Sequence, residues 1–203
     1  MGTQLIPGPG GAGPRPRART RPRGLVILLL AVLAVTGCGP AAPAPVPTTV
    51  TGNATDVMFL QMSLAYADQG DQVAAIAEQR AADPRVRALA ARLRAEWHAE
   101  SETMRHWLLG WQQPLTPDPA AGVHAGHGDL QSLRPADVAD LRAARPADLD
   151  RTALTLLTGH LHNCVAVSRM ESAAGGYPPA RDLAAAITAA RQEEIRQMLQ
   201  FIA

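Results

Sequence analysis

The sequence contains no lysine and few aromatic residues. All 19 basic residues of the 203-residue chain are arginines, and aromatic side chains make up 3%. From Cys38 onward fourteen arginines face eighteen acidic residues, so this part of the chain is acidic. A nucleic-acid-binding protein needs a basic face to neutralise phosphates, and that class is therefore excluded. The scarcity of aromatic residues, together with abundant alanine, also argues against a β-sheet protein.

Cysteine is also rare in the sequence, where Cys38 and Cys164 are the only two. They cannot form a disulfide-rich scaffold. A basic stretch and an eleven-residue apolar run, 25–35, precede Cys38. As a helix this run would rise only ~16 Å, too short for a hydrocarbon core of ~30 Å, so it predicts a secretory signal. A short transmembrane anchor with an incidental cysteine is the alternative.

The end of this run, Val35-Thr36-Gly37-Cys38, resembles a bacterial lipobox. The resemblance implies a lipoprotein signal peptide over residues 1–37 and a lipid on the Cys38 thiol. Residues 38–54 carry four prolines and predict an extended tether, which at ~3.1 Å per residue reaches up to ~50 Å. Two or three acyl chains anchor a protein stably. We therefore expect a lipid-anchored protein on the extracytoplasmic face of the cell membrane.

The rest of the chain repeats itself with an offset of 94 residues. Asp, Pro, Glu and Met recur in one register without a gap, as in the pairs Asp56 and Asp150, Pro84 and Pro178, Glu100 and Glu194, Met104 and Met198. Each half has two apolar stripes with steps of three and four residues, which is typical of helices. The pattern predicts an all-α fold: a ferritin-like, up-down four-helix bundle over residues 55–203, built from two tandem helical hairpins, 55–111 and 147–203.

Helix boundaries follow from prolines and caps. We expect the first helix over about 56–82, capped by Thr55 or Asp56. The second is expected to begin at Asp83-Pro84, the third at Pro146 and the last at Pro178, because proline suits the first helical position. Gly175-Gly176 predicts the end of the third helix. Between the hairpins, the linker 112–146 is rich in Pro and Gly and includes a short predicted helix at 135–144.

Two acidic residues lie on stripes that should face the bundle interior. Glu100 falls between Trp97 and Met104, and Glu194 is its counterpart near Met198. A buried carboxylate is unfavourable unless it is paired or bound to a metal. The sequence leaves open whether these residues are metal ligands or members of a structural ion pair with an arginine.

Other metal-ligating residues gather on the same stripes. His160 and Cys164 are four residues apart and share one helix face, and imidazole with thiolate suits zinc or copper(I). Met104 and Met198 add thioethers, although methionine and free cysteine also serve as ordinary core residues. His124 and His127 lie in the linker and are candidates for a second, labile metal site.

No enzyme signature is present in the sequence. A di-metal carboxylate bundle needs Glu-x-x-His on two helices, but Thr103 follows Glu100 and Gln197 follows Glu194 at that spacing. Phosphate-binding glycine loops, His-Glu-x-x-His and Gly-x-Ser-x-Gly are also missing. We therefore expect a non-catalytic protein.

The two halves resemble the DUF305 family of secreted bacterial proteins. The family pattern is Asp-x-x-Phe-Leu-x-x-Met, a His-His pair, and then Gln-x-x-Glu-Ile-x-x-Met-x-x-Trp-Leu. The matching residues are Asp56, Phe59, Leu60, Met62, Glu100, Met104, Trp107 and Leu108 in the first half, and Asp150, Leu154, His160, Glu194, Ile195, Met198, Phe201 and Ile202 in the second. Met62 lies one residue before the position of the first Met in the pattern. The resemblance implies a ferritin-like bundle of two similar halves and, for some members, copper binding through His and Met.

This sequence departs from the family pattern where the histidines and glutamines should stand. Tyr66-Ala67 and His160-Leu161 replace the two His-His pairs, while Trp97 and Arg191 replace the glutamines. Two hypotheses follow. The protein binds or buffers a soft metal, copper or zinc, through His160 with Met104, Met198, Glu100, Glu194 or Cys164. Alternatively, it is a non-catalytic interaction or scaffold bundle at the cell surface that has lost metal binding.

Overall fold

The computed structural model describes residues 51–117 and 133–202. The predicted signal peptide, the lipid on Cys38 and the histidines His124 and His127 concern residues outside these ranges. Within them the chain forms five helices and no strand: α1 (Ala54–Arg80), α2 (Pro84–Gly110), α3 (Pro135–Ala143), α4 (Pro146–Ala174) and α5 (Pro178–Ile202). In the described ranges no helix is both long and apolar enough to span a bilayer.

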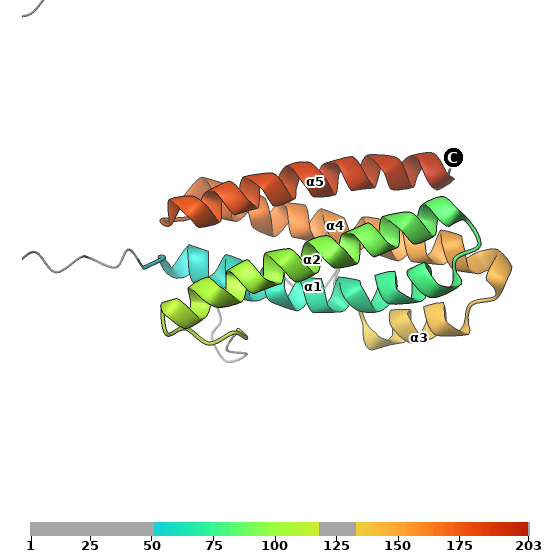
Figure 1. The fold of residues 1–203 in the computed structure, drawn as a ribbon, viewed down its shortest axis with the longest axis horizontal. Coiled ribbons are helices and arrows are strands. Elements are labelled where there is room, and N and C mark those ends of the chain that lie inside the picture. The colour runs from blue at the N-terminus through green and yellow to red at the C-terminus, as the bar shows by residue number, and fades with distance from the viewer. Residues whose placement is uncertain (1–50, 118–132, 203) are drawn as a thin grey trace, which may run out of the picture. The chain divides into compact units, whose positions relative to one another are not determined.

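The four long helices form two antiparallel hairpins, α1–α2 and α4–α5. The hairpins pack together mainly through α1 and α4, and the short helix α3 lies against both of these (Figure 1). Each long helix buries one apolar stripe, and the stripes meet in a single core. The structure therefore confirms the all-α, four-helix architecture that the 94-residue repeat predicts.

The first helix begins earlier than the sequence indicated, and the expectation that Thr55 or Asp56 caps it is wrong. Asn53 is the N-cap, and its side-chain oxygen accepts hydrogen bonds from the backbone N–H groups of Thr55 (2.8 Å) and Asp56 (3.0 Å). The Asp56 carboxylate accepts the N–H of Asn53 in return. This is a reciprocal capping box, in which the acidic residue occupies the third helical position rather than the cap.

Equivalent aspartates join the two hairpins at opposite ends of the bundle. Asp56 accepts hydrogen bonds from the N–H groups of Gly176 (3.0 Å) and Tyr177 (2.9 Å), in the α4–α5 turn. Asp150 accepts them from Ala82 (2.9 Å) and Asp83 (2.8 Å), in the α1–α2 turn. Donors and acceptors are related by the same 94-residue offset. The sequence repeat is therefore a structural repeat in which each half holds the turn of the other.

Candidate functional site at the bundle centre

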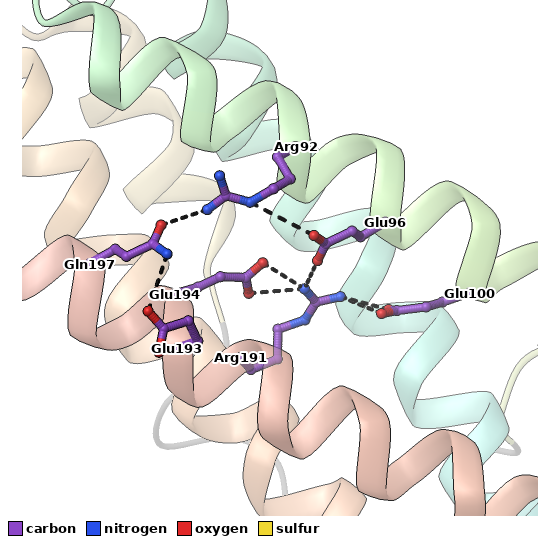
Figure 2. A network of polar contacts seen from close by, with 7 residues as sticks. All are labelled: Arg92, Glu96, Glu100, Arg191, Glu193, Glu194 and Gln197. Carbon is purple, nitrogen blue, oxygen red and sulfur yellow. Dashed lines mark hydrogen bonds and ion pairs between the residues drawn. The ribbon is translucent and has the colours of Figure 1, made fainter. Parts of the chain in front are cut away.

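Glu100 on α2 and Glu194 on α5 converge on one arginine. The Arg191 guanidinium donates two hydrogen bonds to Glu100 (2.6 and 2.7 Å) and two to Glu194 (3.1 and 2.9 Å). It also donates one to Glu96 at 2.6 Å (Figure 2). Arg191 is 0% exposed and is among the largest fully buried side chains of the described residues. Of the two alternatives for the inward carboxylates, the structure contains the ion pair.

Three carboxylates face a single guanidinium, and this imbalance shifts their protonation. Burial raises the pKa of Glu100, and the positive charge of Arg191 offsets only part of that rise. Burial likewise raises the pKa of Glu194, with Glu96 adding to the rise. The Arg191 guanidinium lies 5.6 Å from the centre of the Trp97 ring, a cation–π contact. Arg191, Glu96, Glu100 and Glu194 thus form an ion-pair network between α2 and α5, and the Trp97 ring covers one side of it.

His160 lies beside this ion-pair network at the middle of the bundle. Its Nε2 is 2.9 Å from the carbonyl oxygen of Tyr66, which fixes Nε2 as the protonated donor. The rings of Tyr66 and Trp97 contact the imidazole edge to face, with centroids 5.6 and 5.8 Å away. Burial lowers the pKa of His160 to about 4, and the Arg191 charge lowers it further. His160 is therefore a neutral, packed imidazole, and Tyr66 is its partner across the 94-residue repeat.

Close packing of α1 against this group requires a glycine. A Cβ atom on Gly70 would lie 2.5 Å from the Trp97 ring and 2.7 Å from Nε2 of His160. No side chain fits that space without displacing an aromatic ring or breaking the imidazole hydrogen bond. The absence of a side chain at Gly70 thus allows Trp97 and His160 to pack directly against the backbone of α1.

Cys164 adjoins His160 but does not act as a reactive thiolate. Its Sγ is 3.9 Å from Nε2 of His160, and burial raises the pKa of the thiol to about 12. A thiol with this pKa remains protonated at neutral pH, whereas soft metal ions bind the thiolate. Cys164 is the free cysteine of the described ranges. In this state it packs as a small apolar residue.

The predicted methionine ligands are also core residues. Met104 is 2% exposed and Met198 is 0% exposed, and the sulfur of Met198 accepts a hydrogen bond from the Thr158 hydroxyl at 3.4 Å. Met104, Cys164, Glu100 and Arg191 do line a common cavity, but its volume is only about 10 Å³. That space suits about one water molecule. No larger ligand fits there without rearrangement.

The described residues bring the predicted ligands near one another without forming a metal site. Within 51–117 and 133–202, no group of three or more His, Cys, Asp or Glu side chains is arranged to hold a metal ion. Glu100 and Glu194 point at Arg191, while Nε2 of His160 is engaged by a backbone carbonyl. His124 and His127 lie in the undescribed linker, and their role stays a prediction.

Sequence reasoning missed the residue that organises the centre. Arg191 was recognised only as a departure from a family glutamine, because an arginine on a helix is usually solvent-exposed. A usable signal was nevertheless present. Position 191 is the repeat partner of Trp97, which lies on the apolar stripe of the first half. A charge at the counterpart of a core tryptophan, near two inward glutamates, indicates a buried ion pair.

A second buried acidic group lies where α1 begins. Glu171 is 0% exposed and adjoins Asp56, whose carboxylate holds three backbone N–H groups. Burial and the neighbouring Asp56 charge raise the pKa of Glu171 to about 8. The Glu171 carboxyl also occupies the place of a Cβ on Gly175, which would lie 2.1 Å from it. Gly175 is thus needed for space, in addition to ending α4.

These features define a class of protein: a tandem-hairpin four-helix bundle whose interior is filled by a buried arginine–carboxylate network and a neutral histidine. Residues 56–202 match the family described as "Domain of unknown function (DUF305)". The chain belongs to the DUF305 family, and the resemblance seen in the sequence motifs is confirmed.

Solved structures share this fold. A DUF305 fragment from Deinococcus radiodurans is 26% identical, with a TM-score of 0.65, and the match covers 74% of this chain and 97% of that chain. A DUF305 protein from Streptomyces coelicolor is 20% identical, with a TM-score of 0.67 and coverage of 72% and 91%. CopM in its Cu(II)-bound form is 23% identical, with a TM-score of 0.60 and coverage of 72% and 94%. No curated protein matches the sequence.

Proposed function

We propose that this protein is a non-catalytic DUF305 bundle, tethered by a lipid on Cys38 to the extracytoplasmic face of the membrane, where it acts through its surface. One observation carries the proposal: Arg191 is fully buried and engages Glu96, Glu100 and Glu194, so the polar centre of the bundle is already occupied by a cation. The lipobox-like segment and the proline-rich tether support the location. The relative from Streptomyces coelicolor, named as a candidate secreted protein, supports it as well.

The chemistry of the centre does not fit a metal ion. A cation entering near His160 would meet the guanidinium of Arg191 and a thiol with a pKa of about 12. At Nε2 it would also have to replace the hydrogen bond between His160 and the Tyr66 carbonyl, so that only Nδ1, which is buried without a hydrogen-bond partner, is open to it. The carboxylates that could attract it are held by Arg191. Binding there would therefore require an arginine to leave a fully buried position, which removes the charge balance of three glutamates.

Soft-metal binding or buffering, for copper above all, is the second candidate function. It is favoured by the shared fold of CopM, which has been solved in Cu(II)-, Cu(I)- and Ag-bound forms. In this chain the available ligands would be His160 with Cys164 and Met104 after rearrangement, or His124 and His127 in the linker. Imidazole and thiolate also bind zinc, so the same residues are candidate zinc ligands.

Metal titration of the full-length protein in mild detergent separates the two candidates. We expect no bound Cu(I), Ag⁺ or Zn²⁺ at the bundle centre, and thus no difference between the wild type and the variants His160→Ala and Cys164→Ser. One equivalent of tightly bound Cu(I) that His160→Ala abolishes would overturn the proposal. Loss of binding only in the double variant His124→Ala/His127→Ala would place the metal in the linker. Mass spectrometry of the peptide containing Cys38 tests the lipid independently.

A further inference from the structure

One end of the bundle is built from segments without charged side chains. Three segments, 51–55, 107–117 and 172–180, contain no Asp, Glu, Lys, Arg or His. They meet because the Asn53 side chain donates to the carbonyl of Ala174 at 3.0 Å, and because Trp111 packs against Tyr177 and Gly52. The start of α1, the end of α2 and the α4–α5 turn lie at the same end of the bundle (Figure 1). We name these three segments together the tether end, since residues 51–54 are the last of the predicted tether.

The tether end is rich in interfacial aromatic residues. The chain has seven aromatic side chains in all, and Trp107, Trp111 and Tyr177 cluster here with ring centroids 5.5 and 5.0 Å apart. All three rings are partly exposed. Leu109 lies between the two tryptophans in the sequence and is 62% exposed, the largest exposure among the bulky apolar side chains of the described ranges.

The opposite end of the bundle has a contrasting composition. Its turns carry many ionic groups, namely Arg80, Asp83, Arg85, Arg87, Arg142, Arg145, Asp148, Asp150 and Arg151. Two acidic residues that adjoin these segments in the sequence, Asp56 and Glu171, are 0% exposed. Asp118 lies outside the described residues, and Arg181 and Asp182, which follow the third segment, are exposed. Among the described residues, one end of the bundle is therefore rich in ionic groups, whereas the three segments of the other end carry aromatic rings and no charge. The predicted tether is continuous with the first of these three segments.

We propose that the tether end rests on the lipid bilayer, with Trp107, Leu109, Trp111 and Tyr177 in the headgroup region. This inference deepens the proposed function and rests on its lipid anchor at Cys38. Only twelve residues separate Cys38 from Thr51, so the anchor holds the tether end within ~40 Å of the surface. Tryptophan and tyrosine favour the membrane interface because each ring combines an apolar body with a polar group.

The composition of this surface also predicts which lipids it contacts. Polybasic surfaces bind anionic lipids with strong salt dependence, whereas the tether end has no charge to offer them. Contact should therefore form on neutral phosphatidylcholine and should change little with ionic strength. It should orient the bundle so that the charged end points away from the membrane.

Quenching of tryptophan fluorescence by brominated lipids tests the inference. The lipidated full-length protein is reconstituted into phosphatidylcholine vesicles, and vesicle flotation is measured on the same samples. Trp97, at 4% exposure in the bundle centre, provides an unquenched background. We expect quenching of up to about two thirds of the emission, since two of the three tryptophans lie at the interface. The variant Leu109→Glu should lose at least half of this quenching, whereas Leu199→Glu, a change at a 54% exposed leucine of α5 outside the tether end, should retain it.

The outcomes distinguish this inference from the proposed function. Flotation without quenching would overturn the membrane contact and leave the lipid anchor intact. A wild-type chain that does not float would overturn both. Quenching that Leu109→Glu and Leu199→Glu leave equally unchanged would overturn the assignment to the tether end. Absent quenching together with a dimer that Leu109→Glu dissociates would replace the bilayer by a second copy of the chain. Circular dichroism verifies that both variants keep their helices.

Discussion

Replacing Arg191 by methionine should destabilise the bundle strongly and make its stability depend on pH. Methionine keeps much of the side-chain volume but removes the guanidinium. Glu194, with a side chain 4% exposed, and Glu100, 18% exposed, then lose their counter-ion. Removing one partner of a buried ion pair typically lowers the free energy of unfolding by about 3–5 kcal/mol. For a domain of this size that corresponds to a melting temperature lower by roughly 10 °C.

The sign of the pH dependence follows from the raised carboxyl pKa values. An acid whose pKa is higher in the folded than in the unfolded state stabilises the fold while it is protonated, and this stabilisation is lost as the pH rises through the folded-state pKa. Burial already raises the pKa of Glu100 and Glu194, and removing Arg191 must raise both further. Arg191→Met should therefore be most destabilised near pH 8 and should recover near pH 5, where both carboxyls take up protons.

Urea unfolding followed by circular dichroism, on the full chain carrying Cys38→Ser in mild detergent, measures this effect. Arg196→Met is the matched control on the same helix, because Arg196 pairs with Glu193 while both side chains are more than half exposed. An exposed pair of this kind contributes about 0–1 kcal/mol. Adding Glu100→Gln and Glu194→Gln to Arg191→Met should restore most of the lost stability. An Arg191→Met variant that is no less stable near pH 8 than Arg196→Met would show that Arg191 does not stabilise the buried glutamates.

Three further predictions concern residues around the centre and the tether end. Gly70→Ala should destabilise the fold by about 1–3 kcal/mol, because the new Cβ would clash with Trp97. Gly159→Ala is the control: its Cβ would meet nothing within 4 Å, so it should stabilise α4 by about 0.5–1 kcal/mol. Thermal melts in which Gly70→Ala is as stable as Gly159→Ala would contradict the close packing at Gly70. Glu171→Gln should abolish a loss of stability of up to about 1.4 kcal/mol per pH unit that the wild type shows as the pH rises toward 8; equal slopes in both proteins would exclude the raised pKa. The ring resonances of His160, assigned with His160→Gln, should stay constant from neutral pH down to about pH 5, and a shift in that interval would show that the imidazole takes up a proton.

The architecture was predictable because the repeat and the helix periodicity are properties of the backbone and its apolar stripes. Pro84, Pro146 and Pro178 stand at the starts of three helices, as their lack of an N–H requires. The N-cap of the first helix is not predictable in the same way, because both Asn53 and Asp56 form hydrogen bonds in the capping box. Either could be mistaken for the single cap when only the sequence is read.

The candidate site was less predictable than the fold. Periodicity placed Glu100 and Glu194 on inward faces, and both are buried or nearly so. What decides their role is Arg191, which comes from a different hairpin than Glu96 and Glu100 and meets them only through tertiary packing. Helical spacing gives the face of a side chain but not its partner on another helix. The protonation of His160 and Cys164 was hidden for the same reason, because burial by α1 and α2 sets it.

The Arg191 guanidinium holds the carboxylates at the middle of this DUF305 bundle, and we propose that it leaves no place there for a metal ion. Crystals grown with excess Ag⁺ or Cu(I) and measured for anomalous scattering test this claim most directly. We expect no anomalous peak between the four long helices, with Arg191 in bidentate contact with Glu100. An anomalous peak within bonding distance of His160 or Cys164, with Arg191 turned away from its glutamates, would contradict it.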